Sequence, residues 1–169
     1  KIVEPVLFIG FIIHILYSVI ITFQNWSARN KSYSKNDRNK NSTWVSRNMI
    51  WLGLAVGCFL VIHLANFFIK IKFGEMQEVS YNGVHMHDSY SLVTSYFAIW
   101  WYDVIYILGS FFLGLHLYHA FWSAFQTIGW SNDLWRRRLT RLGLLYTVIV
   151  AGGFISIPAF FLIKNYFLS

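Results

Sequence analysis

Two histidines of this chain lie at matching depths inside segments that are apolar enough to cross a membrane. His14 precedes Gln24 by ten residues, His116 precedes Gln126 by ten residues, and each glutamine marks the end of its apolar segment. At 1.5 Å per residue, both imidazoles should lie about 15 Å from the same membrane boundary. An ionisable group at such a depth is costly and usually faces a partner or a cofactor. We therefore expect these two imidazoles to face each other across a metal.

The metal centre that fits two neutral imidazoles in a helical bundle is a b-type haem, which needs a flat apolar slot. Gly10, one turn before His14, and Ala120, one turn after His116, could leave room for the porphyrin. Cys58 is the single cysteine and is expected to be a small buried core residue, so the chain has no disulfide framework and no thiolate cluster. The absence of a CxxCH motif excludes attachment of a c-type haem.

The remaining histidines leave alternatives open. His63 lies in an oppositely directed segment, closer to the other membrane face, so it needs either no cofactor or a ligand partner outside these segments. His119 could compete with His116 as a ligand, although its depth matches that of the first histidine less well. His85 and His87 belong to a polar connection, where solvated residues, a small metal site and proton exchange are all open interpretations.

Composition places the chain in a lipid bilayer. Of its 169 residues, 56% are hydrophobic and only 12% are charged, outside the range of soluble domains. Four stretches reach the roughly 20 residues that a crossing requires, at about 2–23, 48–71, 99–125 and 141–163. The sequence therefore predicts one all-α domain, residues 1–169, built as a transmembrane helical bundle. Gly53 and Gly57 form a GxxxG motif that predicts close helix packing, with close passage of a flat cofactor as the alternative, and 152–153 with Pro158 predict a loosened or kinked last span.

Charge predicts the orientation of the bundle. The net charge of +7 is concentrated in the connections 24–47 and 127–140, which are therefore expected on the cytoplasmic side. Connection 72–98 contains Glu75, Glu78 and Asp88 and no basic residue after Lys72, so we expect it to face outward. The same distribution argues against nucleic acid as a partner. Seven tryptophans lie near the predicted span ends, as an interfacial belt requires: Trp26, Trp44, Trp51, Trp100, Trp101, Trp130 and Trp135.

The segment from Phe112 to Trp130, FLGLHLYHAFWSAFQTIGW, resembles the cytochrome b membrane subunit of succinate dehydrogenase and fumarate reductase, in its single-anchor, two-haem form. Segment 14–23, HILYSVIITF, is similar to the second helix of that family, and segment 61–64, VIHL, is similar to its third. The resemblance covers nearly the whole chain. It is closest to the subunits of the Bacteroidetes group.

The resemblance implies five transmembrane helices, of which this sequence contains four, and four haem-ligating histidines. His14 and His116 would ligate the haem nearer the cytoplasm, and His63 would ligate the outer haem together with a histidine of the first helix. We expect that helix to precede Lys1. The family has Asn where His119 stands, which favours His116 as the ligand.

The implied function is the non-catalytic electron-transfer subunit of a succinate:quinone oxidoreductase in the bacterial cytoplasmic membrane. Its implied partners are a flavoprotein subunit with FAD, an iron–sulfur subunit, and a membrane quinone, expected to be menaquinone. Four residues have the character of a quinone pocket but equally that of interfacial anchors: Trp100, Trp101, Tyr102 and Asp103. The alternatives are a dihaem cytochrome b subunit of a hydrogenase or formate dehydrogenase, a haem-free membrane anchor, and a small transporter.

Overall fold

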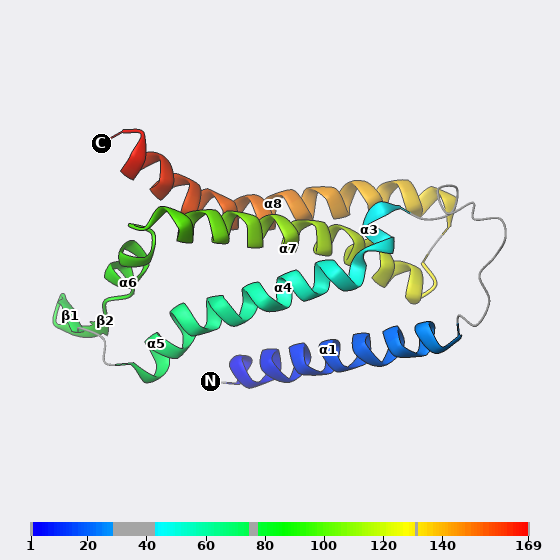
Figure 1. Cartoon of the computed structure of the whole chain (residues 1–169), viewed down its shortest axis with the longest axis horizontal. Coiled ribbons are helices and arrows are strands. Elements are labelled where there is room, and N and C mark those ends of the chain that lie inside the picture. The colour runs from blue at the N-terminus through cyan, green and yellow to red at the C-terminus, as the bar shows by residue number, and fades with distance from the viewer. Residues whose placement is uncertain (1, 29–42, 75–77, 131, 169) are drawn as a thin grey trace. The chain divides into compact units, whose positions relative to one another are not determined.

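The structure is a computed structural model that describes residues 2–28, 43–74, 78–130 and 132–168. The chain divides into two compact units, Lys1–Ile50 and Trp51–Ser169. Among the described residues, four helical stretches are long and apolar enough to cross a membrane: Val3–Ala28, Met49–Phe73, Trp100–Thr127 and Trp135–Tyr166 (Figure 1). The chain is therefore an all-α, membrane-embedded protein, as the composition predicts.

The first unit contains α1 (Val3–Ala28) and the short α3 (Trp44–Arg47). Two hydroxyl groups of α1 form hydrogen bonds to backbone carbonyls one turn earlier in the same helix. The Ser18 hydroxyl donates to the His14 carbonyl at 2.8 Å, and the Thr22 hydroxyl donates to the Ser18 carbonyl at 2.7 Å. Most basic residues of the expected cytoplasmic connection 24–47 fall in 29–42, outside the described residues.

The second membrane-spanning stretch consists of α4 (Met49–His63), a π-helical turn η1 (Leu64–Phe68) and α5 (Ile69–Phe73). The expectation of a buried cysteine is wrong for the structure as described, because Cys58 is exposed. Its position explains the difference. Leu52 is buried, and Cys58 lies six residues later, about 120° round the helix from it.

The connection after α5 contains an antiparallel hairpin of β1 (Glu78–Tyr81) and β2 (Val84–His87), followed by α6 (Ser89–Tyr96). Asn82 and Gly83 form its two-residue turn, with φ of 53° and 80°. Asn-Gly is the preferred pair for such a turn, because both positions need a positive φ. The Asp88 carboxylate then caps α6 by accepting a hydrogen bond from the Ser91 backbone N–H at 3.0 Å.

The last two helices, α7 (Trp100–Thr127) and α8 (Asp133–Tyr166), run antiparallel and side by side (Figure 1). Glycines bring them together, since a Cβ on Gly114 would lie 3.0 Å from that of Ala151. With 34 residues α8 is about 51 Å long, which exceeds the roughly 30 Å hydrocarbon core. It begins well before the expected span at 141, so much of the expected connection 127–140 is helical.

The carboxyl-terminal end of α8 is fastened to the corner between α6 and α7. The Tyr166 hydroxyl donates to the Ala98 carbonyl at 2.8 Å and accepts from the Trp100 backbone N–H at 3.1 Å. The Asn165 amide donates to the Phe97 carbonyl at 3.0 Å. The bond to Tyr166 satisfies the Trp100 N–H, which α7 itself leaves without a partner, and the other two bonds satisfy carbonyls of the corner.

Candidate functional site

Two glycines set the register between α4 and α7 in the second unit. A Cβ on Gly53 of α4 would lie 3.5 Å from Cε1 of His116 on α7. In the other direction, a Cβ on Gly109 of α7 would collide with the Phe59 ring of α4. The His116 ring of α7 therefore lies against Gly53 of α4, and the Phe59 ring of α4 lies against Gly109 of α7. Because the later residue of one helix meets the earlier residue of the other, the two helices run antiparallel.

His116 is half-buried on α7, with its imidazole against the side-chain-free surface of Gly53. Gly57 lies one turn further along α4, and no described atom lies within 4 Å of the place its Cβ would occupy. The GxxxG pair thus has two roles: Gly53 admits the imidazole, and Gly57 leaves open space beside α4. Both features suit a flat ligand held by His116.

His63, at the end of α4, has a different environment. Its ring centroid lies 5.4 Å from that of Phe67, 6.1 Å from that of Tyr106 and 6.2 Å from that of Phe59. The imidazole is half-buried within this aromatic group. Apolar rings exclude water from a neutral imidazole, which is the form that binds a metal.

The π-helical turn η1 follows directly after His63. Asn66 and Phe67 are consecutive residues of this turn, yet both contact Tyr106 of α7. The Asn66 amide donates to the Tyr106 hydroxyl at 3.3 Å, and the Phe67 and Tyr106 centroids are 5.7 Å apart. The wider turn helps two neighbouring side chains reach the same partner, and π-turns are frequent at functional sites.

His63 and His116 lie at separate levels. Gly53 lies beside His116 and His63 beside Tyr106, so ten residues separate the two levels along either helix. At 1.5 Å per residue this spacing is about 15 Å. This spacing is too long for both imidazoles to ligate one metal ion, and the assignment of either histidine to a haem stays a prediction.

Of the other sequence-predicted histidines, His119 shares α7 with His116, and the rest lie on α1 and in the hairpin. His14 is exposed on α1, which belongs to the first unit, and its pairing with His116 stays a prediction. His119 is half-buried one turn after His116. In the hairpin, Nδ1 of His85 lies 3.8 Å from a carboxylate oxygen of Glu78, with both side chains largely exposed. Within the ranges that the structure describes, no three His, Cys, Asp or Glu side chains gather as a metal site.

A buried acid lies near the amino-terminal end of α7. Asp103 has no exposed surface, and no group of the described residues hydrogen bonds to either of its carboxyl oxygens. Tyr106 and Ser110, one and two turns further on, are buried on the same helix face. An ionised carboxylate without a partner is expensive in an apolar interior, so Asp103 needs a proton or a ligand. The sequence identified Asp103 as a polar residue near the boundary but gave no sign of its burial.

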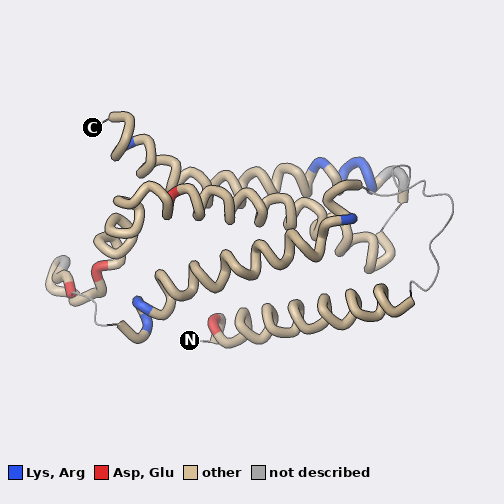
Figure 2. Tube along the Cα trace, viewed as in Figure 1, with Lys and Arg blue, Asp and Glu red and all other residues tan. Residues whose placement is uncertain are grey.

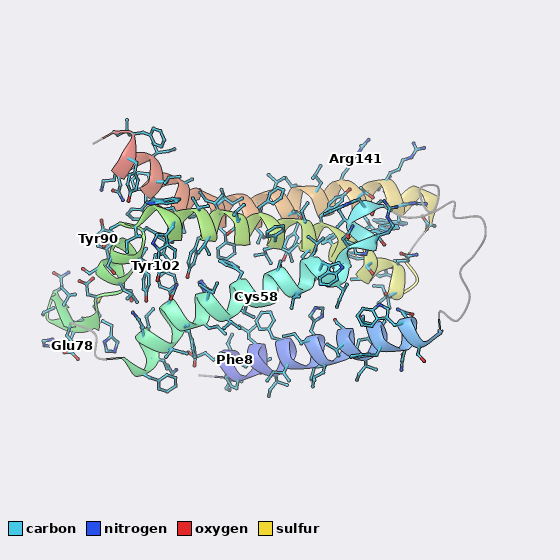
Figure 3. The ribbon with its side chains drawn as sticks, in the orientation of Figure 1. Phe8, Cys58, Glu78, Tyr90, Tyr102 and Arg141 are labelled. Carbon is cyan, nitrogen blue, oxygen red and sulfur yellow. The ribbon has the colours of Figure 1, made fainter. Side chains whose placement is uncertain are left out.

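The other residues considered for a quinone pocket differ in their surroundings, although the rings of Trp101 and Tyr102 are stacked with their centroids 3.7 Å apart. Trp100 and Trp101 are exposed, as interfacial anchors would be. Tyr102 instead lies against α6, with its ring centroid 4.9 Å from that of Tyr96 (Figure 3). Lys70 of α5 places its ammonium 4.8 Å from the Tyr96 ring centroid. Aromatic rings, a cation and a buried acid thus lie at the same end of the second unit, where α5, α6 and the start of α7 come together.

The residues present fit haem ligation. The donors are imidazoles on membrane-spanning helices, Gly53 provides a cradle that a larger side chain would fill, and aromatic rings surround His63. Comparisons with models of protein families, with characterised proteins and with solved structures found no match to this chain. The case for a function therefore rests on its own residues and on the resemblance of its segments.

Proposed function

We propose that this chain is the membrane-anchor cytochrome b subunit of a succinate:quinone oxidoreductase, the class of succinate dehydrogenase and fumarate reductase. The observation that carries the proposal is the placing of His63 and His116 on neighbouring membrane-spanning helices, about 15 Å apart in level. Costly polar groups at two levels of an apolar bundle are best explained by two cofactors.

His14 and His116 would hold one haem b, and His63 would hold a second together with a histidine that none of these four helices provides. With imidazole on both sides of the iron, the haem supplies one-electron exchange and has no open position for oxygen. Gly53 gives His116 the space to turn toward α4. Phe59, Phe67 and Tyr106 hold the His63 ring and keep water from it.

The partners follow from this function. A flavoprotein subunit with FAD and an iron–sulfur subunit would interconvert succinate and fumarate on the cytoplasmic side of a bacterial membrane. Connections 24–47 and 127–140 would face these subunits, and connection 72–98 would face outward. Of the basic residues in the second connection, Arg136, Arg137 and Arg138 lie on the first turns of α8.

The quinone, expected to be menaquinone, would bind near the outer end of α7. Its reduction to a quinol takes up two electrons and two protons. Asp103 is placed to hold and pass a proton there, because it is a buried acid without a hydrogen-bond partner in the described chain. Tyr96 and Tyr102 would supply the aromatic wall.

The test is a reduced-minus-oxidised spectrum of the purified complex, with bound haem quantified and the co-purifying subunits identified. We expect two b haems for each complex, together with a flavoprotein and an iron–sulfur protein. A nickel or molybdenum subunit would instead assign the chain to a hydrogenase or formate dehydrogenase. A complex without Soret absorbance would leave a haem-free anchor or transporter.

Replacement of Gly53 tests the cradle within the same experiment. Gly53→Ala adds a Cβ at ordinary contact distance from His116, so both haems should remain. Gly53→Leu fills the space that the imidazole occupies and should remove the haem of His116 alone. If Gly53→Leu kept full haem content, His116 would not bind a haem through this cradle.

A further inference from the structure

The amino-terminal turns of α8 carry a dense group of positive charges. Arg136, Arg137, Arg138 and Arg141 are all exposed (Figure 2). Because the structure makes this segment helical, these residues have defined directions round α8. The proposed electron transfer does not require that arrangement.

The buried face of this segment is occupied by α7. Leu139 is 4% exposed, and a Cβ on Gly143 would lie 2.8 Å from the Phe121 ring of α7. Arg137 and Arg141 each lie two residues from Leu139, so at 100° per residue both point about 160° away from it. Figure 3 places Arg141 on the side of α8 away from α7. These two arginines are therefore neighbours on the outward face.

The other two arginines are held by tryptophans. Cζ of Arg136 lies 5.6 Å from the Trp122 ring centroid on α7, and that of Arg138 lies 5.6 Å from the Trp135 ring centroid. These contacts keep positive charge close beside the outward pair. No acidic side chain of the described residues forms an ion pair with Arg137 or Arg141. The two arginines are four residues apart on the helix, so their positive charges repel each other. An anion bound between the two guanidinium groups would relieve that repulsion.

Apolar side chains continue the same face into the membrane. The membrane-spanning stretch of α8 begins at Trp135. Leu144, Leu145 and Val148 lie within about 80° of both Arg137 and Arg141 round the helix, and are 53%, 57% and 59% exposed. A ligand on this face therefore meets guanidinium groups at one end and hydrocarbon at the other.

We propose that this face of α8 is a binding site for an anionic phospholipid. The phosphate accepts hydrogen bonds from Arg137 and Arg141, whose planar forks suit a phosphate. One acyl chain lies along Leu144, Leu145 and Val148. An acidic protein surface would match the arginines but would not account for the apolar residues that follow them on the same face.

The test uses the purified complex after delipidation, with its thermal unfolding followed as lipid is added. Phosphatidylglycerol should raise the midpoint at concentrations where phosphatidylcholine does not. Each basic residue at a membrane surface is worth about 1 kcal/mol, so Arg137→Gln/Arg141→Gln should weaken the apparent affinity for phosphatidylglycerol about thirtyfold. The matched control Lys164→Gln, at the other end of α8, should leave it unchanged.

Two further arms keep the proposal falsifiable. Arg137→Lys/Arg141→Lys retains the charge in case the glutamine variant does not fold, and should bind with intermediate affinity because lysine lacks the fork. Inorganic phosphate at the same concentration should give no protection, and equal protection would overturn the assignment to a lipid. Equal effects of the two lipids would also overturn the proposal. The proposal would also be overturned if Arg137→Gln/Arg141→Gln kept its response to phosphatidylglycerol but no longer bound the soluble subunits.

Discussion

Two aspartates fifteen residues apart have opposite environments. Asp88 is only partly buried before α6, and its carboxylate accepts hydrogen bonds from both the backbone N–H and the hydroxyl of Ser91. Asp103 is fully buried in α7 and has no such bond from the described residues. The acid in water has the partners that a structural role requires. The acid in the membrane lacks them, which is the pattern of a group kept for function at the expense of stability.

The largest effect that this comparison predicts is on quinone turnover. Asp103→Asn removes the exchangeable proton while keeping the shape of the side chain. Succinate:quinone activity should fall about a hundredfold or more, the range typical for loss of an acid or base group. Haem content should stay at the level of the wild type. Asp88→Asn is the matched control and should keep full activity; equal loss in both variants would remove the functional distinction between the two acids.

The second effect is on stability, and its direction is unusual. Asp103→Leu replaces an unpartnered buried carboxyl group by an apolar side chain of similar volume. The variant should be inactive with quinone but more stable by about 1–3 kcal/mol, because the cost of the unsatisfied group is removed. Thermal or denaturant unfolding of the complex in detergent measures this change. A destabilised Asp103→Leu protein would mean that the carboxyl group has a stabilising partner after all.

A smaller effect on stability is expected from the hydrogen bond between Asn66 and Tyr106 in the same region. Tyr106→Phe removes the hydroxyl that accepts the Asn66 amide hydrogen bond. The loss should cost about 1 kcal/mol, the usual value for one such bond. The exposed Tyr90→Phe serves as the control in the same unfolding experiment and should be neutral. An unchanged Tyr106→Phe protein would show that the π-turn is held by ring packing alone.

The smallest effect is the pH dependence of the α6 cap. Hydrogen bonds from the Ser91 hydroxyl and backbone N–H lower the pKa of Asp88 below its ordinary value of 3.8. The cap therefore contributes its full stability above that value and loses it as the pH falls through the lowered pKa. Hydrogen–deuterium exchange of α6, corrected for intrinsic rates, should show more protection than Asp88→Asn at pH 7. The difference should shrink below pH 4, and a constant difference would contradict the cap.

Much of the fold is local in origin and could be predicted. A membrane span is encoded by about 20 consecutive apolar residues, so all four helices appear near their expected places. The hairpin was missed, although its Asn82-Gly83 pair is a strong turn signal. The early start of α8 was missed because its arginines were interpreted as part of a connection. Leu139, buried against α7 in the structure, gives this segment one apolar face on which to continue as a helix.

The site was predictable only in its residue types. Histidines in apolar segments can be recognised from the sequence as candidate site residues, because few other residues there can ionise. The burial of Asp103 and the close approach of Phe59 to Gly109 and of His116 to Gly53 depend on how α4, α7 and α8 pack. That packing joins residues far apart in the chain, and no local pattern reports it. For the same reason Cys58 was expected to be buried, whereas the structure shows it exposed.

The most direct test of the central claim is a count of bound haem in single histidine variants of the complete complex. We predict two b haems in the wild type and in His119→Ala, and one in His116→Ala and in His63→Ala. The two variants with one haem should retain different haems, recognised by different midpoint potentials. If His116→Ala and His63→Ala both kept two haems, with spectra like that of His119→Ala, neither histidine would be a ligand and the proposed function would be contradicted.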